Sequence, residues 1–385
     1  MSTQKAVVVG GSNGVGLAIA SELIKQHYHV IIVDKCKPTA ELNTEQYEFL
    51  QCDLCNFNYE AFEKLSKDEN VNFLMITAGF GRVADFENIH PVEIEKIIKV
   101  NTIASLQIIR SFYDRIKSEK EFFVGVMGSI AGLVSSPMFS VYAASKAAIC
   151  KFVESVNIEL ESYGTTNRIL NVSPGSIKGT RFNGGENDLS ALVDLSSEII
   201  QRIKQKETLF IPNGAVYMDV LERYKENPHK FGIESYQYKQ QSGRVKNEKT
   251  VKIGYLSGTF DLFHIGHLNL LRRAKAQCDY LIVGVHPDAS HKGKETFISF
   301  EERVEIVGAC KYVDKVVESC KEDSDAWILH RFDKLFVGSD YKGSERFKKY
   351  EQFFADKGVE IVYFPYTQGT SSTQIRDYIS KKIDQ

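Results

Sequence analysis

Apolar runs that end in turn residues alternate with helical patterns over the first part of the chain, from Lys5 to about Pro174. Such alternation is typical of βαβ units, in which each strand of a parallel sheet is followed by a crossover helix. The strands are expected at five places: Ala6 to Val9, Val30 to Val33, Phe73 to Thr77, Phe122 to Met127 and Arg168 to Val172. The pattern therefore predicts a doubly wound parallel sheet.

A second alternation begins at Val251 and continues to the end of the chain. Its strands are expected at Lys252 to Leu256, Tyr280 to Val285, Lys334 to Val337 and Glu360 to Phe364. The segment between the two alternations is polar, charged and nearly free of aliphatic residues, so it can add little to a core. The sequence therefore predicts an α/β protein with two doubly wound, Rossmann-like domains, at residues 1–235 and 251–385, joined by a linker at 236–250.

Composition agrees with two ordinary globular domains. The chain has 385 residues, of which 43% are hydrophobic and 25% charged, and its net charge of -2 offers no basic footprint for nucleic acid or an anionic membrane. The N-terminus lacks the regions of a signal peptide, and no apolar stretch is long enough to span a bilayer. Seven cysteines, an odd number, fit a reducing compartment better than a disulfide framework. We therefore expect a cytoplasmic protein.

A glycine-rich turn follows the first strand and leads into a helical run. Glycines at such a corner let the backbone approach a pyrophosphate, whose charge is met by free amides at the helix N-terminus. Asp34 closes the next strand, where an acid can hold the ribose hydroxyls of a dinucleotide. Because its charge would repel a 2'-phosphate, Asp34 favours NAD over NADP, although the adjacent Lys35 partly offsets that repulsion. The turn itself consists of Gly10, Gly11, Ser12, Asn13, Gly14, Val15 and Gly16.

Tyr142 and Lys146 form the first candidate reaction centre. Their spacing in a helical segment puts both side chains on one face, so that an ammonium near the phenol favours its ionised form. A phenol tuned in this way can act as the acid at neutral pH. A catalytic role for this pair is supported by three other features of the sequence: Ser129 at the end of a strand, Asn101, and the segment Pro174 to Ile177.

With these residues in their order, the first 230 residues or so resemble the short-chain dehydrogenase/reductase family. The resemblance implies that Ser129 binds the substrate carbonyl, that Tyr142 donates a proton as hydride arrives, and that Lys146 holds the nicotinamide ribose. It also implies a proton relay supported by Asn101 and an adenine contact from Asp53 in CDL.

The same resemblance implies a wider set of contacts to NAD(H) or NADP(H). The family's usual Asn-Ala-Gly is Thr77, Ala78 and Gly79 here, and the Thr after Pro-Gly comes one residue late, at Thr180. Those two departures concern the cofactor and not the proton donor. The expected cofactor residues are Gly10, Ser12, Asn13, Gly14, Val15, Gly16, Asp34, Asp53, Leu54, Ala78, Gly79, Lys146, Pro174, Gly175 and Ile177.

The second half begins with a strand that is followed by the sequence GTFDLFHIGH and then by a further helical run. His264 and His267 would stand at the N-terminus of that helix, where imidazoles and amide dipoles can both meet charge on a reacting phosphorus. Two metal-binding histidines are one alternative, although no Cys, Asp or Glu lies nearby at the spacing of a zinc site. A histidine that acts as a covalent nucleophile is another, although direct in-line attack needs fewer parts. We therefore predict a phosphate site with no protein-bound metal.

From about Val251 to the end, the chain resembles the cytidylyltransferase family that includes glycerol-3-phosphate cytidylyltransferases. The resemblance implies catalytic roles for His264, His267, Lys292 and Arg303. Its last motif, normally RTEGISTT, begins with Tyr366 in place of the Arg, which leaves the choice of CTP open. The expected nucleotide contacts are Gly258, Thr259, Phe260, His264, His267, Lys294, Asp340, Thr367, Gly369, Ser371, Ser372 and Thr373.

Joined in one chain, a reductase and a cytidylyltransferase imply consecutive steps. We predict NAD(P)H-dependent reduction of a ketose phosphate, ribulose 5-phosphate first, followed by Mg²⁺-dependent transfer of CMP from CTP to give a CDP-polyol for a capsule or cell-wall polymer. The alternatives are CDP-glycerol as the product, an adenylyltransferase second domain, a non-catalytic NAD-sensing first domain, or two unconnected activities. Both families commonly form dimers or tetramers, so a homo-oligomer is expected.

Overall fold

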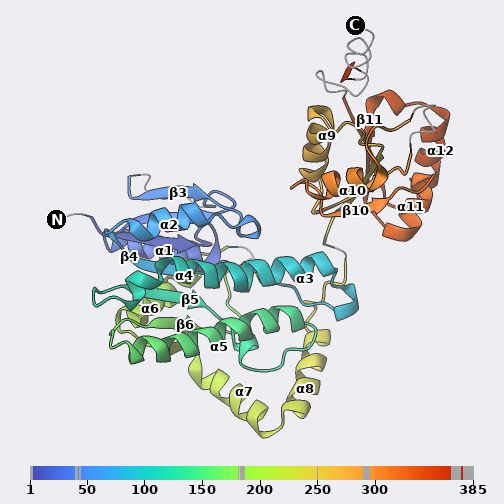
Figure 1. Ribbon diagram of the computed structural model, residues 1–385. Helices are drawn as coiled ribbons and strands as arrows, with labels where there is room; N and C mark the ends of the chain where they lie inside the picture. Colours follow the sequence, from blue (N-terminus) through green and yellow to red (C-terminus); the bar gives the residue numbers. More distant parts are fainter. Residues whose placement is uncertain are drawn as a thin grey trace. The chain divides into compact units, whose positions relative to one another are not determined.

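The computed structural model describes residues 3–39, 42, 45–180, 182, 187–248, 250–288, 295–365 and 374–375. Within it the chain forms two compact units, Met1–Glu248 and Lys249–Gln385, each with its own parallel sheet (Figure 1). Two doubly wound α/β domains are thus confirmed as the fold class.

The first unit contains a seven-stranded sheet in the order β3-β2-β1-β4-β5-β6-β7, in which every neighbouring pair is parallel. Its strands are β1 (Lys5–Val9), β2 (His29–Asp34), β3 (Tyr47–Gln51), β4 (Val71–Ile76), β5 (Phe123–Met127), β6 (Ile169–Val172) and β7 (Leu209–Phe210). Its helices are α1 (Gly14–Lys25), α2 (Tyr59–Lys67), α3 (Pro91–Ile98), α4 (Ala104–Lys117), α5 (Ser140–Ser162), α6 (Val193–Lys204), α7 (Gly214–Glu226) and α8 (Pro228–Gln241).

Helices cover both faces of this sheet, which is why its central strands are continuous apolar runs. On one face, Phe112 of α4 and Val153 of α5 are buried in one core cluster. On the other face, Leu23 of α1 and Ile203 of α6 are buried in a second cluster. Figure 1 shows α4 and α5 crossing the sheet, with α7 and α8 forming a helical hairpin beyond it.

The second unit is a smaller version of the same architecture, with five parallel strands in the order β10-β9-β8-β11-β12. Its core lies between the sheet and α9 and α10, where Leu256, Leu271 and Val307 are fully buried. Its strands are β8 (Ile253–Gly258), β9 (Tyr280–Val285), β10 (Lys315–Glu318), β11 (Lys334–Gly338) and β12 (Glu360–Phe364). Its helices are α9 (Ile265–Lys275), α10 (Phe300–Gly308), α11 (Asp323–His330) and α12 (Glu345–Phe354).

Two features of the fold differ from the sequence-based expectation. All nine expected strands are present, but β3, β7 and β10 were not expected, and all three lie at sheet edges. Helix α8 continues to Gln241, so the first residues of the expected linker are helical. Further along the expected linker, Lys246 and Asn247 pack on the first unit, because Lys246 N–H donates to the Val83 carbonyl and Asp85 N–H to Asn247 Oδ1.

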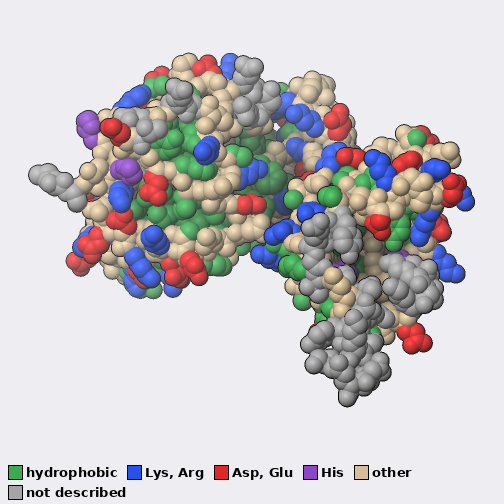
Figure 2. Space-filling model, turned by 90° about the horizontal axis from the view of Figure 1, so that it is seen from above, with side chains coloured by type: hydrophobic (Ala, Val, Ile, Leu, Met, Phe, Trp, Pro, Cys, Tyr) green, Lys and Arg blue, Asp and Glu red, His purple; other side chains and the backbone are tan. Residues whose placement is uncertain are grey.

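The surface carries no dominant charge of either sign on the side that can be seen. Basic and acidic side chains are interspersed over the face shown in Figure 2, in keeping with the net charge of -2. No helix in the described part of the chain combines the length and the apolar character needed to cross a membrane.

Candidate active sites

The glycine-rich turn of the first unit forms a tight corner between β1 and α1. Gly10 has φ of +80°, and a Cβ there would lie 2.5 Å from the Ala78 amide nitrogen, so no other residue fits. Asn13 caps the helix by accepting from Gly14 N–H at 2.9 Å. The first helical hydrogen bond runs from Leu17 N–H to the Asn13 carbonyl, so the Val15 and Gly16 amides make no helical hydrogen bond and can meet an anion. The corner thus fits a dinucleotide pyrophosphate.

Asp34 lies beside this corner at the end of β2. Its carboxylate accepts from Ser12 N–H at 3.1 Å and from Lys35 N–H at 2.7 Å, so the negative charge is fixed next to the turn. Asp53 follows β3, is exposed, and caps a short helix by accepting from Cys55 N–H at 3.0 Å. Their positions suit ribose and adenine contacts, and those roles remain predictions.

Lys146 and Asn101 are buried at the carboxyl ends of the central strands. Lys146 is 2% exposed, and its Nζ donates to the Met127 carbonyl at 2.8 Å. Asn101, fully buried in a π-helical turn (Lys99–Ile103), accepts from Phe80 N–H and donates back to the Phe80 carbonyl, both at 2.9 Å. A π-turn of this kind is frequent at functional sites. Asn101 therefore fixes the segment that follows β4 beside Lys146.

Tyr142 does not have the lowered pKa that the Tyr–Lys spacing predicts. Burial raises the pKa of its phenol to about 12, and a hydrogen bond with Ser129 opposes this only in part. Burial also lowers the pKa of Lys146 to about 8. The Lys146 Nζ lies 5.7 Å from the centre of the Tyr142 ring. The phenol therefore stays protonated at neutral pH, which is the form that can donate a proton.

Three aromatic residues that the sequence did not single out lie at Tyr142 or at the segment that follows β6. Phe139 stacks on its ring with centroids 4.2 Å apart, and the Phe182 ring lies 5.2 Å away. Tyr217 of α7 reaches the Pro174–Gly175 segment, where its hydroxyl accepts from Ser176 N–H at 3.2 Å. Their sequence contexts are those of ordinary core or surface aromatics, so only the fold could assign them to this site.

Three further residues that were considered from the sequence, Ser129, Thr180 and Thr77, lie near the carboxyl ends of the strands or at the glycine turn. Ser129 ends the segment after β5, and its Oγ donates to the Pro174 carbonyl at 3.4 Å. Thr180 lies over the glycine turn, since a Cβ on Gly14 would meet its side chain at 3.6 Å. Thr77, the residue in place of the family Asn, donates to the Val9 carbonyl at 2.9 Å and so ties β4 to the turn.

In the second unit, both imidazoles belong to the first turn of α9. His264 is the N-cap, and its Nδ1 accepts from Gly266 N–H at 3.0 Å. His267 Nδ1 in turn accepts from His264 N–H at 3.4 Å, and the two ring centroids are 4.0 Å apart. Since a neutral imidazole carries one proton, these bonds assign it to Nε2 in each ring. Burial lowers the pKa of His264, so the neutral form dominates at pH 7.

The loop before His264 is held in an unfavourable backbone conformation. Phe260 and Leu262 have φ of 54° and 50°, values that non-glycine residues adopt at a cost and often at functional sites. The buried Asp261 holds the loop by accepting from Phe297 N–H at 3.1 Å and from Ile298 N–H at 3.0 Å. The strained loop is thus fixed by its surroundings before any substrate binds.

Arg303 has a different environment from that expected of a catalytic residue. It is fully buried, and its guanidinium donates to four backbone carbonyls at 2.6 to 3.0 Å. One of these belongs to Thr259 and two follow β9, at His286 and Pro287. Arg303 therefore fixes the loops around the histidines and is better described as a positioning residue.

Two of the other residues that are expected to contact the nucleotide, Thr259 and Asp340, lie in the described part of the second unit. The Thr259 hydroxyl is buried without a hydrogen-bond partner among the described residues, which fits a site that a bound phosphate completes. Asp340 follows β11, the neighbour of β8, and so lies at the same sheet edge as the histidines. The residues that lie outside the described part are Lys292, Lys294, Tyr366, Thr367, Gly369, Ser371, Ser372 and Thr373.

Comparison with protein families gives a separate match for each unit. The short chain dehydrogenase family model matches residues 4–189, and the cytidylyltransferase-like model matches residues 255–378. Glycerol-3-phosphate cytidylyltransferase of Bacillus subtilis is 36% identical over 127 residues, which are 32% of this chain and 93% of that protein.

The relatives of the first unit are more distant. The uncharacterized oxidoreductase TDA5 of Saccharomyces cerevisiae is 32% identical over 186 residues, which are 46% of this chain and 56% of that protein. This chain therefore spans little more than half of TDA5. A crystal structure of a short chain dehydrogenase from Burkholderia cenocepacia in complex with NADP matches with a TM-score of 0.51 and 18% identity, covering 61% of this chain and 98% of that chain. This similarity shows the fold alone.

Two strand-to-helix corners, one beside a buried Tyr–Lys pair and one beside paired imidazoles, and the two family matches define a chain with two enzymatic domains. The chain consists of an N-terminal short-chain dehydrogenase domain, which is an oxidoreductase family, and a C-terminal cytidylyltransferase domain of the family that includes glycerol-3-phosphate cytidylyltransferase.

Proposed function

We propose that the chain makes a CDP-polyol in two steps: NAD(P)H-dependent reduction of a ketose phosphate, then transfer of CMP from CTP to the resulting polyol phosphate with release of pyrophosphate. The observation that carries this proposal is the coexistence on one chain of a buried Tyr142 beside Lys146 and of the His264–His267 pair at the start of α9. The relation to glycerol-3-phosphate cytidylyltransferase supports a polyol phosphate as the acceptor.

In the reductase step, a nicotinamide dinucleotide bound at the Gly10–Gly16 corner would supply the hydride. Ser129 would bind the carbonyl oxygen and Tyr142 would protonate it, because its phenol is protonated at neutral pH. Lys146 would hold the nicotinamide ribose, and Asn101, which fixes the segment after β4, would support the proton relay.

In the transferase step, a phosphate oxygen of the polyol phosphate would attack the α-phosphorus of CTP directly, and pyrophosphate would leave. His264 and His267 would donate through Nε2 to the charge that develops on the phosphate, since their Nδ1 atoms already accept from amides. Mg²⁺ would enter with the triphosphate, because proteins usually bind it through substrate phosphates and few carboxylates. Lys292 and Lys294 remain predicted triphosphate contacts.

Ribulose 5-phosphate is the first choice of substrate, giving CDP-ribitol, and dihydroxyacetone phosphate, giving CDP-glycerol, is the second. To test this, the intact protein is supplied with NADH, NADPH, CTP and Mg²⁺ and a panel of ketose phosphates, and nucleotide-linked alditols are sought by mass spectrometry. A CDP-alditol that requires both NAD(P)H and CTP is the expected result. ATP consumption in place of CTP would favour an adenylyltransferase, and the absence of any nucleotide-linked alditol would contradict the proposal.

Asp34 gives a prediction about the cofactor. Asp34→Asn keeps a side-chain oxygen for the Ser12 amide but removes the charge that would repel a 2'-phosphate. We expect the ratio of kcat/KM for NADPH over NADH to rise by roughly 10-fold, which corresponds to the removal of about 1.4 kcal/mol of repulsion between Asp34 and the 2'-phosphate. Glu48→Gln, the same change at an exposed position of the neighbouring β3, serves as the control. An unchanged ratio in Asp34→Asn would show that Asp34 does not face the ribose.

A further inference from the structure

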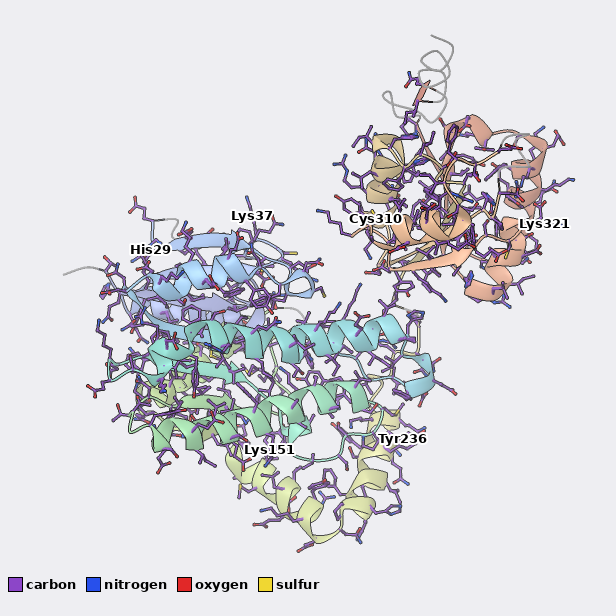
Figure 3. The ribbon with its side chains drawn as sticks, viewed as in Figure 1. His29, Lys37, Lys151, Tyr236, Cys310 and Lys321 are labelled. Carbon is purple, nitrogen blue, oxygen red and sulfur yellow. The ribbon has the colours of Figure 1, made fainter. Side chains whose placement is uncertain are left out.

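A buried cation lies beside the reductase site and is not used in the chemistry proposed above. Lys239 of α8 is only 7% exposed, and its Nζ donates to Ser136 Oγ at 2.7 Å, to the Pro137 carbonyl at 2.9 Å and to Ser235 Oγ at 3.2 Å. Helix α8 carries Tyr236, labelled in Figure 3, next to Ser235. All of the ammonium's protons are thus engaged by neutral oxygens.

This cation has no negative partner within the described part of the chain. Burial, together with the smaller effect of its charged neighbour Arg244, lowers the pKa of Lys239 to about 8. The nearby acid of α8, Glu234, is already paired with Arg223 at 2.5 Å. Since burying an uncompensated charge is costly, two neighbouring cations without a carboxylate are what an anion-binding site requires.

The hydrogen bonds of Lys239 also prepare neutral donors. Because Ser136 Oγ and Ser235 Oγ both accept from the ammonium, their hydroxyl protons are directed elsewhere and can be donated to an anion. The Arg244 guanidinium has only its Nε in a hydrogen bond among the described residues, a long one of 3.4 Å to Ser242 Oγ. Two hydroxyls and the outer nitrogens of Arg244 therefore remain as donors.

The position of this cluster ties it to the reductase. Ser136 begins the turn that ends at Phe139, whose ring stacks on the proton donor Tyr142 at 4.2 Å. Met138 within the turn has φ of 60°, and its carbonyl accepts from Ala84 N–H at 2.7 Å, so the turn is held from both sides. An anion at Ser136 would thus lie along the wall of the site that holds the reacting carbonyl.

We propose that Ser136, Ser235 and Arg244 donate to the phosphate monoester end of the ketose phosphate, with the buried charge of Lys239 behind the two hydroxyls, while the substrate carbonyl lies at Tyr142. This inference rests on the proposed function of the reductase domain, and it assigns the recognition of the phosphate to α8 and the turn after it. The phosphates of the dinucleotide would occupy a different place, at the Gly10–Gly16 corner.

The test compares a ketose phosphate with the same ketose lacking the phosphate, in the intact protein. In Lys239→Met and Arg244→Gln, KM for the phosphorylated substrate should rise roughly 10- to 100-fold, the loss of one charge-assisted interaction. The kcat and the KM of the unphosphorylated ketose should stay within about twofold. Lys230→Met, at an exposed lysine of the same helix, is the control and should change neither constant.

A second measurement separates this inference from the proposed function. Methionine at position 239 removes a buried charge but also the donor to Ser136 Oγ, the Pro137 carbonyl and Ser235 Oγ, so the melting temperature of each variant is measured beside its kinetics. If no ketose phosphate is reduced, the proposed function fails, but titration of inorganic phosphate by calorimetry should still show a site in the wild type that Lys239→Met lacks. Equal phosphate binding in the two proteins, or equal losses on both substrates with a lower melting temperature, would overturn the inference.

Discussion

Replacing Tyr142 with phenylalanine should lower NAD(P)H oxidation by at least about 100-fold, the low end of the contribution of a positioned proton donor. The change removes one hydroxyl and keeps the ring, so the stacking on Phe139 and the fold should persist. Turnover of CTP should be unaffected, because the histidines belong to a separate compact unit. The measurement is the initial rate of NAD(P)H oxidation at saturating ketose phosphate, with pyrophosphate release assayed in the same preparation.

Tyr163→Phe provides a matched control, since Tyr163 caps the same helix but is 58% exposed. It should oxidise NAD(P)H at the wild-type rate. Full activity in Tyr142→Phe would mean that another group protonates the carbonyl. A non-catalytic sensing role for the first domain would instead predict no NAD(P)H oxidation in either variant or in the wild type.

The sequence predicted the central strands of both sheets, which form continuous apolar runs, and also the edge strand β12, in which Ile361 to Phe364 form such a run. Tyr280–Val285 and Glu360–Phe364 were placed to the residue, and the other expected strands to within two residues at either end. The three strands that were missed lie at sheet edges, where one side of the strand has no neighbour. β7 has only two residues, and β3 and β10 contain no buried residue, so neither forms a continuous apolar run.

The site residues that could be predicted share a simple geometry. Residues that follow parallel strands lie at the same end of the sheet, where all the strands have their carboxyl ends. This places Ser129 on the same side as the glycine turn, and His264 on the same side as Asp340, independently of the conformation of the loops between them. Contacts made by long side chains from elsewhere could not be predicted. Lys239 in α8 was part of a segment expected to be a linker, and its burial depends on how α8 packs against the turn at Ser136.

The sequence was also a poor guide to electrostatics. The spacing of Tyr142 and Lys146 predicted that the ammonium would lower the phenol's pKa, yet desolvation is the largest effect on both groups. Spacing along a helix gives proximity but not burial, and burial disfavours the charged form of each. The same limit applies to Arg303, for which the family resemblance implied a catalytic role, while its guanidinium donates to backbone carbonyls.

His264 allows a variant that separates chemistry from helix stability. His264→Asn should keep α9 capped, because an asparagine side-chain oxygen can accept from the same first-turn amide that His264 Nδ1 accepts from now. It removes the Nε2 donor, and losing one preorganised donor to a developing negative charge costs roughly 100- to 1,000-fold in kcat. We therefore expect pyrophosphate release from CTP to fall by that factor while the melting temperature and NAD(P)H oxidation stay at wild-type values.

The matched control is His229→Asn, at an exposed histidine in the first turn of α8, which should leave both activities intact. His267→Ala tests the partner imidazole and should also lose CTP turnover, because the Nδ1 of His267 accepts from the His264 amide and so holds the turn that carries both imidazoles. If His264→Asn retained full turnover, the histidine pair would serve only to start the helix. The phosphate charge would then have to be met by the first-turn amides and by Lys292 and Lys294, whose replacement would become the decisive measurement.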